Sequence, residues 1–153
     1  MTLISPLNRL CQQVYVASGV LAFAATFAPL WSAYESVDYF ETMSLWGAVA
    51  VDEGGVALMG VMMLLTEVAC LFAAGALAKR GPGLAVTIAS VSAIAMLLLL
   101  TKPDSATPEP TMGSGGRMLF AVSILLILTA IADVVDWFLT RRVASATQQA
   151  DMA

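Results

Sequence analysis

The sequence has no histidine and only two cysteines. Histidine is the commonest side chain for proton shuttling, zinc binding and haem ligation, so its absence excludes many catalytic and metal-dependent sites. Cys11 and Cys70 both fall at or inside hydrophobic stretches and do not form a disulfide framework. We therefore interpret both as free thiols, and we expect no cofactor.

Charge is also scarce, because charged residues make up 12% of the 153 residues and hydrophobic residues 59%. Soluble domains are only roughly 45–50% apolar, so this composition argues against a water-soluble fold. A net charge of -4, without a clustered basic surface, argues against nucleic acid as a partner. The sequence contains no glycine-rich phosphate loop, nucleophile elbow or paired-cysteine motif, and we expect a protein without enzymatic activity.

Four hydrophobic stretches predict an all-α fold: a polytopic membrane protein whose single domain, residues 1–153, is a four-transmembrane-helix bundle. Each stretch is long enough to cross about 30 Å of hydrocarbon at about 1.5 Å per residue. The expected helices and loops are residues 10–31, 55–78, 84–101 and 118–139, with outer loops 32–54 and 102–117 and an inner loop 79–83. A signal peptide is the alternative for the first stretch, because Ala22-Phe23-Ala24 resembles a cleavage site.

Lysine and arginine predict the orientation of the bundle, because cytoplasmic loops retain positive charge. With the N-terminus inside, the cytoplasmic side holds most of these residues: Arg9, Lys79, Arg80, Arg141 and Arg142. The outer side then holds only Lys102 and Arg117. We therefore expect a multi-pass protein with both termini in the cytoplasm. The alanine-, valine- and leucine-rich composition, without glycosylation sequons, indicates a bacterial plasma (inner) membrane.

The first expected outer loop, residues 32–54, is unusually aromatic for a segment exposed to water. Aromatic side chains in such a loop fold over the helix ends, lie in the membrane interface or dock on another protein. Apolar positions spaced by three support at most one or two helical turns here. Five aromatic residues in or beside this loop are candidates for docking a partner: Trp31, Tyr34, Tyr39, Phe40 and Trp46.

Three acidic residues fall inside the hydrophobic stretches: Glu67, Asp133 and Asp136. A charge in hydrocarbon is costly enough to require a partner, a cavity or a function. Glu67 lies near the middle of its stretch, about 18 Å from either end. Asp133 lies about 12 Å inside the cytoplasmic end. Asp136 is closer to Arg141 and within reach of headgroup water, which favours a structural role.

Several roles stay open for Glu67. If the second and fourth helices pack together, Glu67 and Asp133 share a pocket and a proton, as in a proton or cation site or in the acid and base of a membrane enzyme. The alternatives are a protonated Glu67 bonded to Ser90 or Ser92 of the neighbouring helix, and a contact with a partner protein.

Two further patterns concern packing and metal binding. Ala85, Ala89 and Ala93 recur every four residues, and such small-residue faces predict a tight helix bundle. Three methionines at helical spacing are a weak candidate for a copper(I) site, since thioethers bind that ion, although methionine is also a common gap filler. These methionines are Met59, Met62 and Met63.

Two family resemblances involve parts of this pattern. The segment Glu67-Val68-Ala69-Cys70 through Gly75, followed by Lys79-Arg80, resembles the second helix of the DoxX-like family, whereas the fourth helix departs from it. An inside N-terminus with an aromatic first outer loop is similar in outline to claudin-like proteins, but this loop lacks their cysteine pair. Neither resemblance carries a residue role over to this chain.

The pattern as a whole favours a non-catalytic accessory or assembly subunit of a larger bacterial plasma-membrane complex. We expect it to dock through its transmembrane helices and the aromatic outer loop, with the lipid bilayer and other integral membrane proteins as partners. The alternative is a small proton- or cation-coupled transporter that uses Glu67.

Overall fold

The computed structural model describes residues 6–36, 39–51, 56–77, 81–100 and 111–150. Within these ranges the side chains of residues 31–36, 39–43, 48, 51, 56–59 and 143–150 are not described. The chain is mostly helical, as the sequence predicted. A small sheet, which the sequence did not predict, accompanies the helices.

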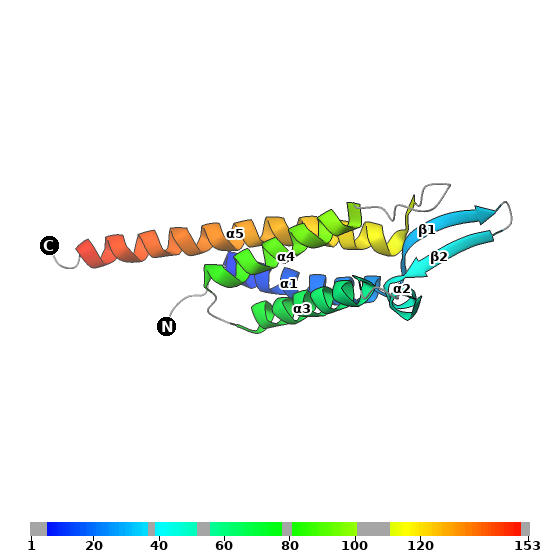
Figure 1. Ribbon diagram of the computed structural model, residues 1–153. Coiled ribbons are helices and arrows are strands. Elements are labelled where there is room, and N and C mark those ends of the chain that lie inside the picture. Colours follow the sequence, from blue (N-terminus) through cyan, green and yellow to red (C-terminus); the bar gives the residue numbers. More distant parts are fainter. Residues whose placement is uncertain (1–5, 37–38, 52–55, 78–80, 101–110, 151–153) are drawn as a thin grey trace.

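Four long helices run side by side (Figure 1): α1 (Pro6–Ala25), α3 (Val56–Ala76), α4 (Pro82–Leu100) and α5 (Ser114–Ala150). Contacts join α1 to α3, α3 to α4, α4 to α5 and α5 to α1, so α3 and α5 lie at opposite corners of the bundle. The start of α1 and the end of α5 lie at one end, which we call the terminal end. The strands lie at the other end, which we call the sheet end.

The first helix is shifted from its expected range of residues 10–31. Pro6 opens α1, where the missing amide hydrogen of proline has no helical partner to lose. After Ala25 the backbone amides of residues 26–28 each bond the carbonyl three residues earlier, which tightens the turn. Pro29 then begins a strand, because proline cannot continue the helical hydrogen bonds.

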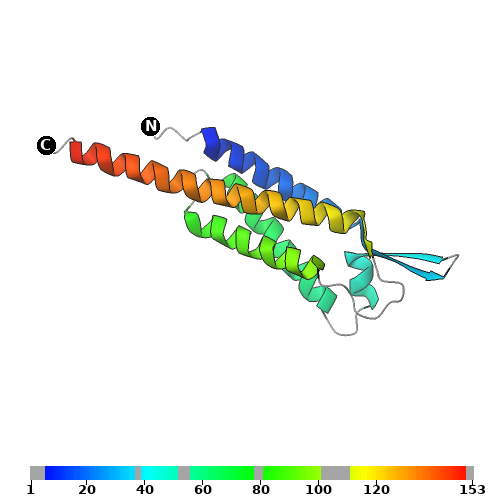
Figure 2. The same cartoon turned by 90° about the horizontal axis from the view of Figure 1, so that it is seen from above.

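The last helix is much longer than the expected residues 118–139. α5 starts at Ser114 and continues to Ala150, because the residues after Arg142 include neither proline nor glycine to end it. Its 37 residues make a rod of about 55 Å, longer than a hydrocarbon core. At the terminal end it extends past the other helices (Figures 1 and 2).

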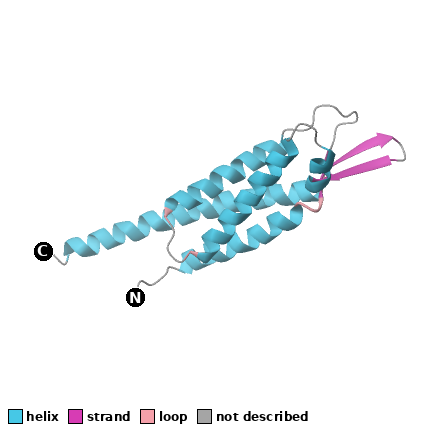
Figure 3. Cartoon of the chain, turned by 60° about the horizontal axis from the view of Figure 1, so that its bottom comes forward, coloured by secondary structure: helices cyan, strands magenta, loops and turns pink. Residues whose placement is uncertain are grey.

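The first outer loop contains a β-hairpin and a short helix, where the sequence predicted at most one or two helical turns. β1 (Pro29–Ser36) pairs antiparallel with β2 (Tyr39–Ser44), and α2 (Leu45–Val51) follows directly. Aromatic and β-branched residues favour such strands. β3 (Thr111–Met112), from the second expected outer loop, pairs with the other edge of β1. The all-α prediction is therefore corrected by a three-stranded sheet, and Figure 3 shows the hairpin of β1 and β2 projecting from the bundle.

Within the part of the chain that the structure describes, two helical segments are long and apolar enough to cross a membrane: Pro82–Leu100 and Ser114–Arg142. In the most apolar part of each segment, only 17% of Pro82–Leu100 and 33% of Ser114–Arg142 is buried inside the bundle. The core helix of a soluble protein, in contrast, is mostly buried. Large apolar side chains such as Leu97 and Leu128 face outward instead. An outer surface this apolar fits a membrane protein.

Glycine allows α1 and α3 to approach closely. A Cβ atom added at Gly75 would meet Cγ2 of Val16, and one added at Gly19 would lie 3.4 Å from Cβ of Leu71. Near the terminal end of the same interface, the side-chain amide of Gln12 donates a 2.9 Å hydrogen bond to the carbonyl of Leu77. The backbone of α3 is therefore fitted to the side chains of α1 along several turns.

We expect Gly75→Ala to lower the free energy of unfolding by about 1–3 kcal/mol, because the new methyl group overpacks the contact with Val16. Adding Val16→Ala should restore most of the loss. Gly83→Ala is the matched control, because an added Cβ there meets nothing within 4 Å. Denaturation with SDS in mixed micelles, followed by circular dichroism, measures all three. Equal stability of Gly75→Ala and Gly83→Ala would contradict the close packing.

Candidate functional site

Glu67 is enclosed in the bundle at the middle of α3, about 16 Å from the start of the helix and about 14 Å from its end. The residue is 3% exposed. Ser92 on α4 donates a 2.6 Å hydrogen bond from Oγ to Oε1 of Glu67. Ser90, the other partner considered, is exposed and donates to the carbonyl of Val86 on its own helix. The hydrogen bond to Ser92 therefore joins α3 to α4.

Helical periodicity explains why these two side chains meet. Leu64, Glu67 and Leu71 are all buried and recur at spacings of three and four, so they share the inner face of α3. Ile88 and Ser92 share the inner face of α4 in the same way. The two helices pack against each other, so one polar pair replaces an apolar layer of the core.

Asp133 has a different neighbour. It is half-buried on α5, and the hydroxyl of Tyr15 on α1 lies 3.4 Å from its Oδ2 in donor geometry. Tyr15 is fully buried, together with Cys11 and Ala22 on the same face of α1. The sequence pattern did not single out Tyr15, although a tyrosine on the apolar face of a helix needs a partner for its hydroxyl.

The shared pocket considered for Glu67 and Asp133 required α3 and α5 to pack together. The structure places these helices at opposite corners, with α1 and α4 between them. Glu67 bonds α4, whereas Asp133 contacts α1. Asp136 is half-buried, and its backbone carbonyl accepts a 2.8 Å hydrogen bond from the hydroxyl of Thr140. The carboxyl of Glu67 therefore links α3 to α4, whereas the carboxyl of Asp133 links α5 to α1.

Trp46, one of the docking candidates, is engaged within the chain. Its Nε1 donates a 2.9 Å hydrogen bond to Oγ1 of Thr26, and its ring stacks on Phe27 with centroids 5.9 Å apart. These contacts fix α2 to the end of α1. The other four docking candidates lie in strands β1 and β2, and their side chains are outside the described residues: Trp31, Tyr34, Tyr39 and Phe40.

An aromatic cluster that the sequence did not predict lies near the terminal end of α5. The guanidinium of Arg141 lies 4.1 Å from the ring centroid of Trp137, and Trp137 meets Phe138 edge to face at 4.9 Å. The spacing of four between tryptophan and arginine was the available signal. Such a group suits a boundary between apolar and polar surroundings.

The proposed copper site is only partly described. Met62 is exposed and Met63 is half-buried, whereas the side chain of Met59 lies outside the described residues, so copper binding stays a prediction. Among the residues that the structure describes, no group of three or more acidic or cysteine side chains is placed to hold a metal ion. Neither Cys11 nor Cys70 is in a disulfide, as predicted.

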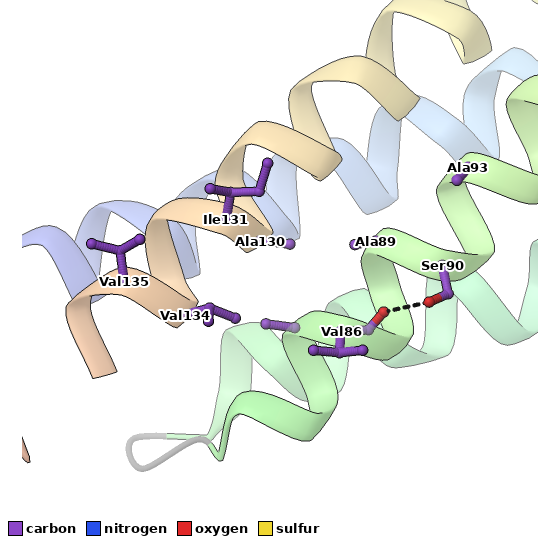
Figure 4. A pocket seen from close by; sticks show the side chains of 9 residues that line it. Val86, Ala89, Ser90, Ala93, Ala130, Ile131, Val134 and Val135 are labelled. Atoms are coloured by element: carbon purple, nitrogen blue, oxygen red, sulfur yellow. Dashed lines mark hydrogen bonds between the residues drawn. The ribbon is translucent and has the colours of Figure 1, made fainter. Parts of the chain in front are cut away.

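The small residues of α4 face α5, where they leave an open apolar groove of about 400 Å³ (Figure 4). Ala89 and Ala93 line it from α4, and Ala130 lines it from α5. Small side chains on both helices bring the backbones close but do not fill the space outside the contact. The groove does not include Glu67 or Asp133.

No protein family, no curated protein and no solved structure matches this chain.

We expect Ser92→Ala to lower the free energy of unfolding by about 1 kcal/mol, the scale of a hydrogen bond between membrane helices. Ser90→Ala is the matched control, because Ser90 bonds only its own helix. Both variants are measured by SDS denaturation in mixed micelles. If the two serine variants lose the same stability, the bond between Ser92 and Glu67 does not hold α3 to α4.

Proposed function

We propose that this chain is a four-helix protein of a bacterial plasma membrane and that α1, α3, α4 and α5 all span the bilayer. α1 and α3 run alongside the two apolar segments that are long enough to cross. They also present large apolar side chains outward, including Phe23 on α1 and Phe72 on α3. A bundle with apolar residues on its outer surface as well as in its core is stable when hydrocarbon surrounds it.

The proposed orientation puts the terminal end in the cytoplasm. Arg9 lies in the first turns of α1, and Arg141 lies on α5 beside the interfacial Trp137. Lys79 and Arg80 are outside the described residues but fall between α3 and α4 in the sequence. At the sheet end, the Nε of Arg117 donates to the carbonyl of Met112. The excess of cations at the terminal end favours the cytoplasmic side.

Labelling of single cysteines tests this orientation. In a chain with Cys11→Ala and Cys70→Ala, we expect Ser114→Cys to react with a membrane-impermeant maleimide added to intact cells, because Ser114 is exposed at the sheet end. Gly81→Cys should react only after the membrane is opened, and its side chain has free space. Labelling of Gly81→Cys in intact cells would reverse or refute the topology.

Within this membrane, we propose a non-catalytic accessory or assembly subunit. The observation that supports this role most directly is the projecting hairpin of β1 and β2 (Figure 3). β3 pairs only with Trp31 and Ser32 of β1, so the rest of the hairpin pairs with itself alone among the described residues. A two-stranded ribbon is marginally stable in water, and open strand edges are sites where another chain adds.

Charge supports a partner with a basic surface. The sequence from residue 10 to residue 78 includes no lysine or arginine. Five acids fall between positions 35 and 53 of this stretch of sequence: Glu35, Asp38, Glu41, Asp52 and Glu53. Complementary charge speeds association and excludes acidic partners.

Purification of the tagged full-length chain from its native membranes in mild detergent tests the docking role. We expect a stoichiometric partner to copurify and to be lost in Tyr34→Ser with Phe40→Ser, two residues that lie opposite each other in the hairpin register. Leu97→Ala, at an exposed position on α4, is the control and should keep the partner. Recovery of the wild-type chain alone would contradict the proposal.

A proton- or cation-coupled transporter is the second candidate, and the buried carboxyl of Glu67 is the observation that favours it. The two functions respond differently to one substitution. Glu67→Gln should abolish coupled transport in reconstituted vesicles but leave partner copurification unchanged.

A further inference from the structure

The groove between α4 and α5 occupies only the half of α4 nearest the terminal end. It follows α4 from Ala85 to Ala93, a length of about 12 Å, and its other wall is formed by residues 130–135 of α5. Because α4 runs from Pro82 to Leu100, the groove stops near the middle of the helix. In a bilayer with about 30 Å of hydrocarbon, this length is close to the hydrocarbon depth of one leaflet.

The lining of the groove suits a hydrocarbon chain. Ala89 is half-buried and Ala130 is buried, whereas Val86 and Val135 are exposed beside them. Ser90 adds a hydroxyl, which donates to the carbonyl of Val86 (Figure 4) and so needs no bond from an occupant. A methylene group is about as large as a water molecule, about 30 Å³, so the groove holds about a dozen carbon atoms.

A helix that spans the bilayer fits this surface less well than a lipid tail. Such a helix packs along the whole hydrocarbon depth, and close helix pairs in membranes use small residues at the contact. Leu97 and Leu100 follow Ala93 by four and seven residues on the same face of α4, and both are more than half exposed. On α5, Ile124 precedes Ile131 by seven residues and is also exposed. Small residues therefore give way to large ones at mid-depth.

Two cations lie beyond the groove at the terminal end. Arg141 follows Val134 by seven residues, or about two helical turns, so it lies on the same face of α5 and about 10 Å closer to that end. Arg142 has the same relation to Val135. Both arginine side chains are exposed. The groove face of α5 therefore ends in positive charge.

The nearby acids of α5 lie away from this face. Asp136 is about 140° around the helix from the groove residue Ile131. Asp133 lies against Tyr15 of α1, on the side of α5 that faces the bundle. An anion at the two arginines therefore avoids the direct repulsion of these carboxylates.

Aromatic side chains connect the groove to the arginines. The guanidinium of Arg141 lies 4.1 Å from the ring centroid of Trp137. This contact uses the plane of the guanidinium, whereas the N–H groups that bond phosphate lie at its edge. Phe138 is 55% exposed and lies one turn beyond Val134, so the path from the groove to the arginines stays apolar.

We propose that the groove binds one acyl chain of an anionic phospholipid and that Arg141 and Arg142 bind the phosphate of its headgroup. The lipid belongs to the leaflet at the terminal end, which is the cytoplasmic leaflet in the proposed orientation. Basic sites between transmembrane helices on the cytoplasmic side recognise anionic headgroups. The site rests on the proposed membrane location of the chain but not on its docking role.

Native mass spectrometry of the full-length chain in detergent, titrated with defined lipids, tests the headgroup site. We expect the wild type to bind phosphatidylglycerol at least about tenfold more tightly than phosphatidylcholine with the same acyl chains, since two cations face the phosphate. Arg141→Gln with Arg142→Gln should lose this preference. Arg9→Gln is the control, because Arg9 is an exposed cation at the same end of the bundle but on α1, and it should keep the preference.

A substitution that fills the groove tests the acyl-chain site. We expect Ser90→Phe to weaken the binding of both lipids by about tenfold, because the ring occupies space that the chain needs. Thr87→Phe is the matched control. Thr87 is also exposed on α4 and also donates to the carbonyl four residues earlier, but it does not line the groove. Its lipid affinities should equal those of the wild type.

Several outcomes would overturn the proposal. These are equal affinity of the wild type for the two lipids, a preference that survives the loss of both arginines, and equal affinities of Ser90→Phe and Thr87→Phe. A dimer, or a copurifying protein, that Ser90→Phe alone removes would assign the groove to another helix instead. Because both arginines are exposed, their substitution tests the site even if Ser90→Phe does not fold. A chain that is soluble without detergent would refute the membrane location itself, so the two failures are distinguishable.

Discussion

The hydrogen bond between Ser92 and Glu67 is the interaction on which the arrangement of the bundle most depends. It joins a carboxyl near the middle of α3 to α4, in a core whose other buried side chains are mostly apolar. A polar group in such a core is stable only when a partner within the protein satisfies it. The partner therefore has to lie on a neighbouring helix at the same depth, and this requirement sets the register of α3 against α4.

The other helix pairs are held by different means. α1 meets α3 through glycine at positions 19 and 75, where backbone and side chain approach closely. α4 meets α5 through alanines, which leave a groove on the outer surface (Figure 4). α5 meets α1 near Asp133 and Tyr15. Close packing and a few interhelical polar contacts are the means available to helices surrounded by lipid, because lipid provides no hydrophobic driving force between them.

The two ends of the molecule differ in a way that supports a docking role. At the sheet end, Trp46 and Thr26 anchor α2 on α1, and the hairpin projects from this base. At the terminal end, α5 continues past the other helices and carries the stacked pair of Trp137 and Arg141. Both extensions leave the four-helix core unchanged, so the chain can present surfaces on either side of the proposed membrane while its core stays closed.

Sequence periodicity and composition determined the mostly helical fold, the approximate position of each long helix and the special status of Glu67. A long apolar stretch has few alternatives to a helix, and the sequence alone shows an acid within it. The serine partner was also predictable as a choice between two, because Ser90 and Ser92 lie about 200° apart around the helix and only one of them can face α3. The hairpin was missed because its apolar spacing drifts between helical and strand periods.

Tertiary structure alone decided which helices are neighbours. The sequence gives no order around the bundle, so it left open whether Glu67 faces Asp133 or Ser92, and the diagonal placement of α3 and α5 separates the two acids. It also predicted close packing at the alanines of α4, but not the groove that they leave beside α5. Helical period fixes the face on which a residue lies, but only packing fixes what that face meets.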